Sequence, residues 1–157
     1  MPNSSELKVK KIMNGTVIDH IPSGRALDIL KIIRITGKEG NVVLIAMNVE
    51  SRKLGKKDII KIENRYLFKD ELNLIALVAP NATINIVKNY DVIEKIKVEL
   101  PEKFEGILKC HNPSCITNYE RESLSPKFLV EDKVKLTLRC FYCGRSMFIS
   151  DVLKQLA

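Results

Sequence analysis

The sequence contains no tryptophan, only two histidines and no cysteine in its first 109 residues. It has no apolar run long enough to cross a membrane, since the uncharged stretch Asn73 to Val87, part of the longest such run, is interrupted by Pro80 and by asparagines. The first residues, MPNSSELKVKK, lack the apolar segment of a secretion signal. These absences predict a soluble protein that acts in the cytoplasm and has no membrane partner.

Familiar catalytic motifs are missing as well. Neither G-x-S-x-G nor H-E-x-x-H occurs, and the "GKK" of Gly55 to Lys57 lacks the upstream glycine of a phosphate-binding P-loop. Asp19 and His20 are neighbours in "GTVIDHIP", but consecutive residues of a strand point to opposite faces of a sheet. We therefore expect no catalytic residue. A small enzyme that uses this pair is an alternative, and it predicts turnover by the isolated chain.

The net charge of +7 raises the question of nucleic-acid binding. Residues 1–100 carry 17 basic and 12 acidic side chains, a net of +5, whereas residues 101–157 carry 9 and 7, a net of +2. If the four cysteines bind one Zn²⁺ as thiolates, the site carries a net charge of −2. This charge would cancel the +2 of residues 101–157. A neutral cysteine-rich segment and few aromatic residues disfavour a nucleic-acid partner. The alternative, a nucleic-acid-binding zinc ribbon, predicts affinity that falls steeply with salt.

All four cysteines lie in the last third of the chain, in the pattern C-x4-C, 24 residues, then C-x2-C. Two close pairs of this kind can provide the four thiolates of a tetrahedral zinc site, and a closed shell of four protein ligands indicates a structural metal. Disulfides or redox-active pairs are the alternative, which the missing secretion signal disfavours. His111 lies inside the first pair and is an alternative ligand, but four thiolates complete the shell, so it is expected at the surface. The predicted ligands are Cys110, Cys115, Cys140 and Cys143.

The sequence predicts two domains, residues 1–100 and 101–157, with their boundary in the Pro-containing segment Leu100 to Gly106. The second is too short to bury a large core, so the metal takes the place of a core. Around it we expect a small all-β zinc ribbon, with a turn at Glu131 and Asp132. Its predicted strands are 106–109, 127–130, 133–139 and 147–149.

The first hundred residues alternate between strand and helix patterns. Ser23 is expected to cap a helix whose apolar stripe is Leu27, Leu30 and Ile33, reinforced by Ala26 and Ile29. A second helix is predicted over residues 70–78, and strands over 7–12, 16–21, 42–49, 58–62, 83–87 and 92–98. The order β-α-β-β-α-β with an extra strand predicts a ferredoxin-like α+β sandwich, an antiparallel sheet with two helices.

Polar side chains recur at or near the ends of these strands. Lys57 and Lys61 share one face of their strand, while Ile60 and Ile62 share the other. His20, Asn85 and Lys95 lie at or near the ends of other strands. Convergence of these groups would suit a polyphosphate, which offers many acceptors for charge-assisted hydrogen bonds. A solvated face without a ligand is the alternative.

Four segments closely resemble the regulatory chain of aspartate carbamoyltransferase. They are "NGTVIDHIP", "GKKDIIKIEN", "APNATIN" and "NYDV", starting at residues 14, 55, 79 and 89, and the cysteine pattern follows them. The resemblance implies a non-catalytic regulatory subunit of pyrimidine biosynthesis, which binds nucleotide effectors of the CTP, ATP and UTP class. It also implies homodimers of regulatory chains that join catalytic chains in a dodecamer of six catalytic and six regulatory chains.

The resemblance assigns roles to individual positions. Asp19 and Lys61 would hold the ribose and base side of the nucleotide. The phosphates would be surrounded by His20, Lys57, Asn85, Val92 and Lys95. The base pocket would be lined by Val9, Ile12, Val87 and Tyr90. The four cysteines match the zinc ligands.

Beside the cysteines the match to the family is less complete. Asn112 and Tyr142 fit the pattern of the surface that docks the catalytic chain, but Ser114 and Gly144 replace an expected amide and an acidic side chain. We therefore expect the same interface with altered detail. The resemblance leaves open which nucleotides activate or inhibit, and whether Mg²⁺ and a second nucleotide join the first.

Overall fold

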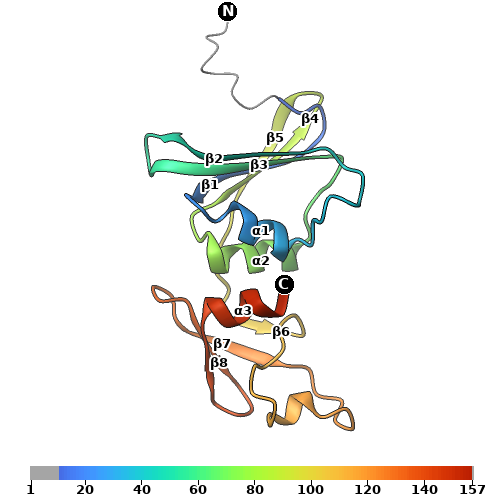
Figure 1. The fold of residues 1–157 in the computed structure, drawn as a ribbon, viewed down its shortest axis with the longest axis vertical. Coiled ribbons are helices and arrows are strands. Elements are labelled where there is room, and N and C mark those ends of the chain that lie inside the picture. Colours follow the sequence, from blue (N-terminus) through green and yellow to red (C-terminus); the bar gives the residue numbers. More distant parts are fainter. Residues whose placement is uncertain (1–10, 157) are drawn as a thin grey trace, which may run out of the picture. The chain divides into compact units, whose positions relative to one another are not determined.

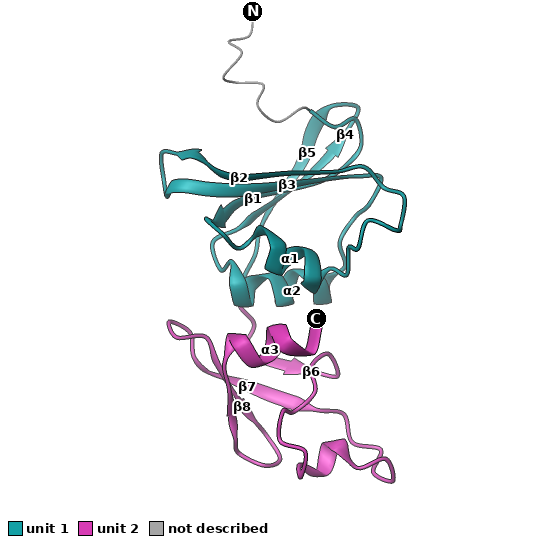
Figure 2. Ribbon diagram, viewed as in Figure 1, with its two compact units in different colours: residues 1–99 teal, residues 100–157 magenta. Residues whose placement is uncertain are grey.

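A computed structural model of the chain describes residues 11–156. The chain divides into two compact units, residues 1–99 and residues 100–157, shown in different colours in Figure 2. None of the helices within the described residues is both long enough and apolar enough to cross a bilayer.

The first unit is a five-stranded antiparallel sheet with two helices on one face (Figure 1). The strand order is β2-β3-β1-β4-β5, so the first strand lies in the middle and β5 extends one edge. This arrangement confirms the predicted ferredoxin-like sandwich. Its elements are β1 (Gly15–Pro22), α1 (Ala26–Ile32), β2 (Val43–Ser51), β3 (Gly55–Glu63), α2 (Lys69–Val78), β4 (Thr83–Lys88) and β5 (Asp91–Lys97).

The alternation of side chains along the central strands explains why the helices cover only one face. In β3, Ile60 and Ile62 are fully buried, whereas Lys57 and Lys61 are partly exposed. The buried side chains face the helices. The opposite face, called the polar face below, carries Lys57 and Lys61 together with the partly exposed Ile59 and Val17. The core contains Ile18, Ile21, Ile29, Ile60, Ile62, Ile75, Leu77 and Ile84.

Helix α1 differs from its prediction at the start and in its buried face. The hydroxyl of Ser23 donates to Asn48 Oδ1 and does not cap the helix, which begins at Ala26. The buried side chains are Ala26, Ile29, Ile32 and Ile33, while Leu27 is 54% exposed. The expected contribution of Ala26, Ile29 and Ile33 to the apolar face is confirmed, and the placement of Leu27 on it is wrong. The strand predicted over residues 7–12 lies mostly outside the described residues, and Ile12 is not in a strand.

The backbone around the start of α1 is held by one buried carboxylate from β3. Asp58 Oδ2 accepts hydrogen bonds from the backbone N–H groups of Gly24 (2.9 Å) and Ala26 (3.1 Å). Its Oδ1 accepts one from the backbone N–H of Asn48 (2.9 Å), a residue of β2 with φ of 61°. Asp58 thus performs the capping role that Ser23 was expected to have, and it also fixes a bulge in β2.

The second unit is a four-stranded antiparallel sheet in the order β6-β7-β8-β9, as expected for a small zinc-ribbon-like domain. The first strand precedes the predicted segment, and the β7–β8 turn comes later than expected because Asp132 Oδ1 accepts the N–H groups of Val134 and Lys135. A helix that the sequence analysis missed follows the last strand. The elements are β6 (Lys103–Glu105), η2 (Ile116–Asn118), β7 (Lys127–Asp132), β8 (Thr137–Cys140), β9 (Ser146–Met147) and α3 (Ile149–Leu156).

Removal of the Asp58 carboxylate should destabilise the first unit. Asp58→Ala leaves three backbone donors without their acceptor, and we expect the free energy of unfolding to fall by about 3 kcal/mol. Asp28→Ala, which removes a partly exposed carboxylate of α1 that pairs with Arg25, should cost only about 0.5 kcal/mol. Urea-induced unfolding followed by circular dichroism measures both. Equal losses would contradict the assignment of Asp58.

Candidate anion-binding face and metal centre

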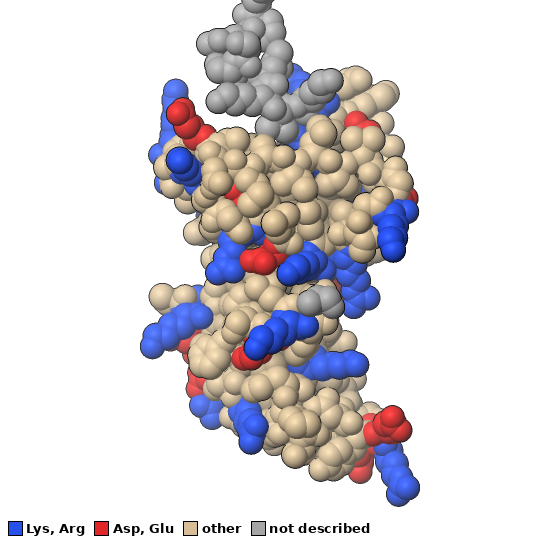
Figure 3. Space-filling view, in the orientation of Figure 1, with Lys and Arg blue, Asp and Glu red and all other residues tan. Residues whose placement is uncertain are grey.

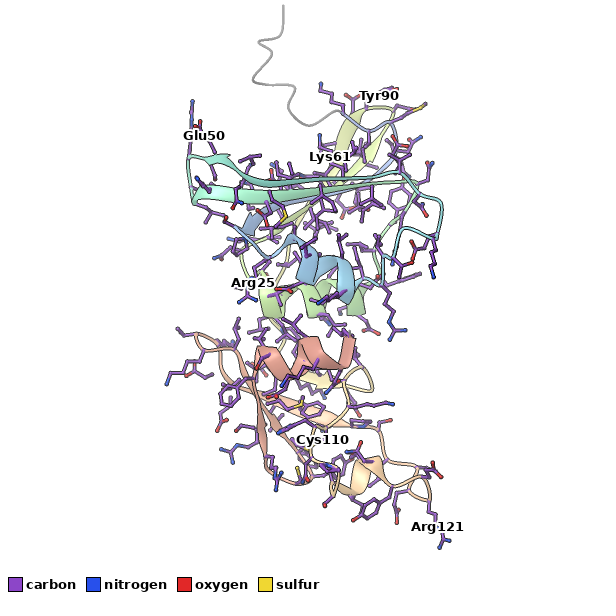
Figure 4. The ribbon with its side chains drawn as sticks, viewed as in Figure 1. Arg25, Glu50, Lys61, Tyr90, Cys110 and Arg121 are labelled. Atoms are coloured by element: carbon purple, nitrogen blue, oxygen red, sulfur yellow. The ribbon has the colours of Figure 1, made fainter. Side chains whose placement is uncertain are left out.

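The strand register gathers several of the predicted site residues in one row across the sheet. Lys61 of β3 lies opposite Val17 of β1, Val17 lies opposite Asn85 of β4, and Asn85 lies opposite Lys95 of β5. Directly paired residues point to the same face, so this row lies on the face away from the helices. Figure 4 shows Lys61 on that face. The convergence that the sequence suggested for Lys61, Asn85 and Lys95 is therefore present.

A β-bulge in β1 brings His20 to the same face. The pairing between β1 and β3 shifts between Ile18 and Ile21, and His20 has a left-handed φ of 58°. His20 Nδ1 and Thr83 Oγ1 are 3.2 Å apart, and Thr83 lies opposite Asp19. The expectation that Asp19 and His20 point to opposite faces is thus wrong here, because a bulge interrupts the alternation of a strand.

Asp19 and Lys57 form an ion pair on this face, with Lys57 Nζ 2.8 Å from Asp19 Oδ1. The same oxygen accepts a hydrogen bond from the backbone N–H of His20 (2.6 Å). Partial burial opposes ionisation of Asp19, but the Lys57 ammonium and the His20 N–H outweigh it and lower the pKa of the carboxyl. The carboxylate is therefore ionised at neutral pH and holds Lys57 in place.

Two further groups of the row lie in a partly desolvated setting. Burial lowers the pKa of Lys61, while the nearby Asp19 carboxylate opposes this shift. Asn85 Oδ1 is buried and has no hydrogen-bond partner among the described residues. A buried acceptor without a partner is costly, and a ligand group that donates a hydrogen bond, such as a hydroxyl or an amino group, would relieve that cost.

An open cavity of about 580 Å³ lies at one end of this face. It is lined by His20 and Lys95, which were predicted, and by Thr83, Lys97 and Lys53, which were not. The sequence carried a signal for two of them, because Thr83 is two residues from Asn85 and Lys97 is two residues from Lys95, which places each on the same face of its strand. Lys53 lies in the turn between β2 and β3, and only the folded hairpin brings it to the cavity.

The remaining predicted residues lie toward the other end of the strands. Val87 and Val92 are paired across β4 and β5, with Gly15 of β1 opposite Val87. Tyr90 is in the β4–β5 turn, where its N–H donates to Met13 O (2.9 Å) and its side chain is 57% exposed. The side chain of Ile12 is buried, and Val9 lies outside the described residues.

The four cysteines of the second unit come together in one cluster, and Figure 4 labels one of them, Cys110. Their sulfur atoms all lie within 4.8 Å of one another, with 3.6 Å between Cys110 and Cys143 and 3.7 Å between Cys115 and Cys140. Tetrahedral zinc with Zn–S bonds of about 2.3 Å places its sulfur ligands about 3.8 Å apart. None of the four forms a disulfide, and His111 is exposed, as expected. The donor set thus fits one tetrahedral metal ion.

Turns rich in backbone hydrogen bonds hold both cysteine pairs. Asn118 Nδ2 donates to the carbonyls of Cys110 (3.0 Å) and Asn112 (2.7 Å), and the Cys115 N–H donates to Asn112 O. In the second pair the N–H of Gly144 donates to Cys140 O (3.0 Å). Gly144 has a φ of 76°, a conformation that favours glycine over the acidic residue expected there.

Burial raises the pKa of the Cys110 and Cys140 thiols. At Cys143 burial acts in the same direction, but hydrogen bonds that include the Arg145 N–H outweigh it and lower the pKa to about 7. A bound dication favours the thiolate form of every cysteine that it touches. The cluster therefore suits a structural metal.

Exposed aromatic side chains lie beside the second cysteine pair. The rings of Phe141 and Tyr142 meet edge to face with centroids 5.3 Å apart, and Phe141 is 57% exposed. Lys127 Nζ lies over the Phe141 ring, 4.7 Å from its centroid. Exposed aromatic residues of this kind are enriched at protein interfaces.

Comparison with known proteins identifies both units. A family model described as "Aspartate carbamoyltransferase regulatory chain, allosteric domain" matches residues 7–99, and the metal binding domain of the same chain matches residues 102–153.

Relatives named aspartate carbamoyltransferase regulatory chain match over nearly their whole length. The protein of Hyperthermus butylicus is 55% identical over 100% of this chain and 98% of its own, and that of Pyrococcus furiosus is 53% identical over 97% and 99%. The relative from Korarchaeum cryptofilum is 51% identical over 97% of both chains. All three are named as regulatory chains of the enzyme. The resemblance seen in the sequence is confirmed, and the chain belongs to the family of aspartate carbamoyltransferase regulatory chains.

Proposed function

We propose that this regulatory chain binds nucleoside triphosphates on the polar face of its first unit and transmits their effect to a catalytic chain. The observation that carries the proposal is the row of Lys61, Asn85 and Lys95, which ends at a cavity lined by lysines. The amide oxygen of Asn85 is buried without a partner among the described residues. It is an acceptor, so it would suit a donor group of the nucleotide, such as a ribose hydroxyl or a base amino group, and not a phosphate oxygen.

The geometry supports a direction for the nucleotide on this face. The phosphates would lie toward the cavity, where His20 and Lys95 are found, and the base toward the β4–β5 turn. Asp19 and Lys61 would contact the ribose and base side. In full, the proposed effector-binding residues are Val9, Ile12, Asp19, His20, Lys57, Lys61, Asn85, Val87, Tyr90, Val92 and Lys95. Mg²⁺ would accompany the nucleotide through its phosphates.

In this proposal residues 1–100 form the allosteric domain and residues 101–157 a structural zinc domain that docks onto a catalytic chain. Zinc would be held by the four cysteines, whose spacing suits it, and would keep the second unit folded. The exposed Phe141 and Tyr142, beside Asn112, would contribute to the docking surface. Ser114 and Gly144 would change its detail.

The proposed assembly has the stoichiometry that the resemblance to the family implies. Its proposed location is the cytoplasm. Regulatory chains would pair through their first units, which the partly exposed Ile45 and Met47 of the edge strand β2 support. These dimers would link catalytic trimers into a complex of six catalytic and six regulatory chains. A nucleotide then controls activity if it binds one quaternary state more tightly than the other.

The metal proposal predicts about one zinc ion per chain in freshly purified protein. A chelator or Cys140→Ser should remove the metal, unfold the second unit and release the chain from its catalytic partner, because the unit has only a small core. Metal analysis and amide hydrogen exchange in β7 and β8 test this. Ser125→Ala, an exposed change in the same unit, serves as the control. Protein without zinc but with oxidised cysteine pairs would refute the proposal.

The regulatory proposal predicts that the purified chain alone transfers no carbamoyl group. When it is mixed with catalytic trimers, light scattering should detect a larger assembly whose activity responds to CTP and ATP. Turnover that stays with the isolated chain through stringent purification would instead support the small-enzyme alternative.

Two lysine variants test the orientation of the nucleotide. Lys95→Ala and Lys61→Ala should each weaken nucleotide binding by about 10- to 150-fold, because each removes a charge-assisted contact. Lys95→Ala should weaken CTP and ATP alike and reduce the preference for triphosphate over monophosphate. Lys61→Ala should leave that preference largely unchanged.

Calorimetric titration measures these affinities, and Lys38→Ala, an exposed loop variant with the same charge change, is the control. All three variants should keep their zinc and their assembly. Unchanged CTP affinity in Lys95→Ala and Lys61→Ala would mean that the row is only a solvated face.

A further inference from the structure

We infer that the β2–β3 turn takes part in nucleotide binding, with Lys53 as the residue that recognises the terminal phosphate of a nucleoside triphosphate. The inference rests on the proposed function, and it assigns a residue that neither the sequence pattern nor the resemblance indicated. The turn comprises residues 52–54, between β2 and β3.

The first argument is the composition of the cavity. Lys53 from the turn and Lys95 and Lys97 from β5 line the same space of about 580 Å³, together with His20. Basic side chains from segments far apart in the sequence therefore face one another across it, and no acidic side chain lines it. Figure 3 shows Lys and Arg side chains gathered over the end of the sheet that carries this turn.

The second argument is that these lysines have no counter-charge within residues 11–156. No carboxylate of that part of the chain lies within ion-pair distance of Lys53, Lys95 or Lys97, whereas Lys57 on the same sheet is paired with Asp19. Like charges that converge on one cavity repel each other, and an anion in the cavity removes that repulsion. An anion that carries several negative charges relieves this repulsion most.

The third argument is the order of residues along the sheet. Val87 and Val92 form one cross-strand pair, and the pairing then shifts between Val87 and Ile86. Asn85 with Lys95 and Thr83 with Lys97 are the next pairs on this face. Along β4 the three positions are two residues apart, which is about 7 Å, since a strand rises about 3.3 Å per residue.

The β2–β3 turn lies beyond the last of these pairs. Asp19 of β1 is opposite Thr83, Pro22 further along β1 is opposite Lys57, and β3 continues from Lys57 to Gly55, where the turn begins. A nucleotide whose base lies near Val92 thus reaches Lys95 with its first phosphates and Lys53 only with its last.

A lysine in a turn suits this role. Its ammonium is a compact charge on a flexible stem, so it can follow the terminal phosphate, which offers more free oxygens than the phosphates within the chain. Arg52 is the neighbouring cation in the same turn, but it does not line the cavity. The two residues therefore form a matched pair, because each change to alanine removes one positive charge from the same exposed turn.

Calorimetric titration of the full chain with CTP, CDP and CMP tests the inference. Lys53→Ala should weaken CTP binding by roughly tenfold or more, weaken CDP binding less, and leave CMP binding within about twofold of the wild type. Arg52→Ala should change none of the three by more than about twofold. Zinc content should be the same in all variants.

The outcomes separate the inference from the proposed function. If the wild type binds CTP and Lys53→Ala matches it, or loses CMP affinity as strongly as CTP affinity, the assignment of Lys53 is wrong while the site remains. Equal losses of CTP affinity in Lys53→Ala and Arg52→Ala would also overturn it, because they would reflect the overall charge of the turn. A wild-type chain that binds none of the three nucleotides would overturn the proposed function and this inference together.

Discussion

The register of β1 between β3 and β4 is the constraint on which the first unit depends. It directs Ile18, Ile60 and Ile84 toward the helices, and it directs Lys61 and Asn85 away from them. A slip of one residue in the pairing would exchange the two faces, burying lysines and exposing isoleucines. The register that buries the apolar core therefore also determines which side chains lie on the opposite face. The packing of the core therefore also sets the positions of the residues in the proposed effector site.

The second unit uses another principle. Its sheet is small, and its buried side chains, such as Phe104, Phe128 and Val152, form a core too limited for a unit of this size to be comfortably stable. The cysteine cluster connects turns that the sheet alone would leave loosely tied, and a metal ion there supplies stability that apolar burial cannot. The two units thus divide the requirements of a regulatory chain. In the proposed function the first offers its polar face to a nucleotide, and the second offers exposed aromatic side chains to a catalytic chain.

Much of this organisation could be predicted from sequence, and the failures have physical causes. Period-two alternation and cysteine spacing are local signals, and they gave the strands, the fold class and the cysteine cluster. The cap of α1 was missed because its acceptor, Asp58, comes from a strand 32 residues away, whereas capping rules consider only neighbours. The bulge at His20 was missed because nothing local marks a non-glycine residue with positive φ. Lys53 could not be placed, because its position depends on how far the β2–β3 hairpin extends past its neighbours. Assigning Leu27 to the core was an error of one residue in helical phase.

The spacing of the cysteines bears on how such a chain can change over evolution. The 24 residues between Cys115 and Cys140 include an exposed loop before β7 and the exposed turn after it, and doubling the length of a loop costs only about 0.6 kcal/mol. Insertions there would lengthen the connection between the two cysteine pairs without moving any of the four cysteines. One residue added within Cys140 to Cys143 would instead rotate a sulfur away from the tetrahedron. Among related chains, insertions and deletions should therefore occur between the two cysteine pairs and not within either pair. The surface formed by the residues between the pairs can then diverge while the arrangement of the four cysteines stays constant.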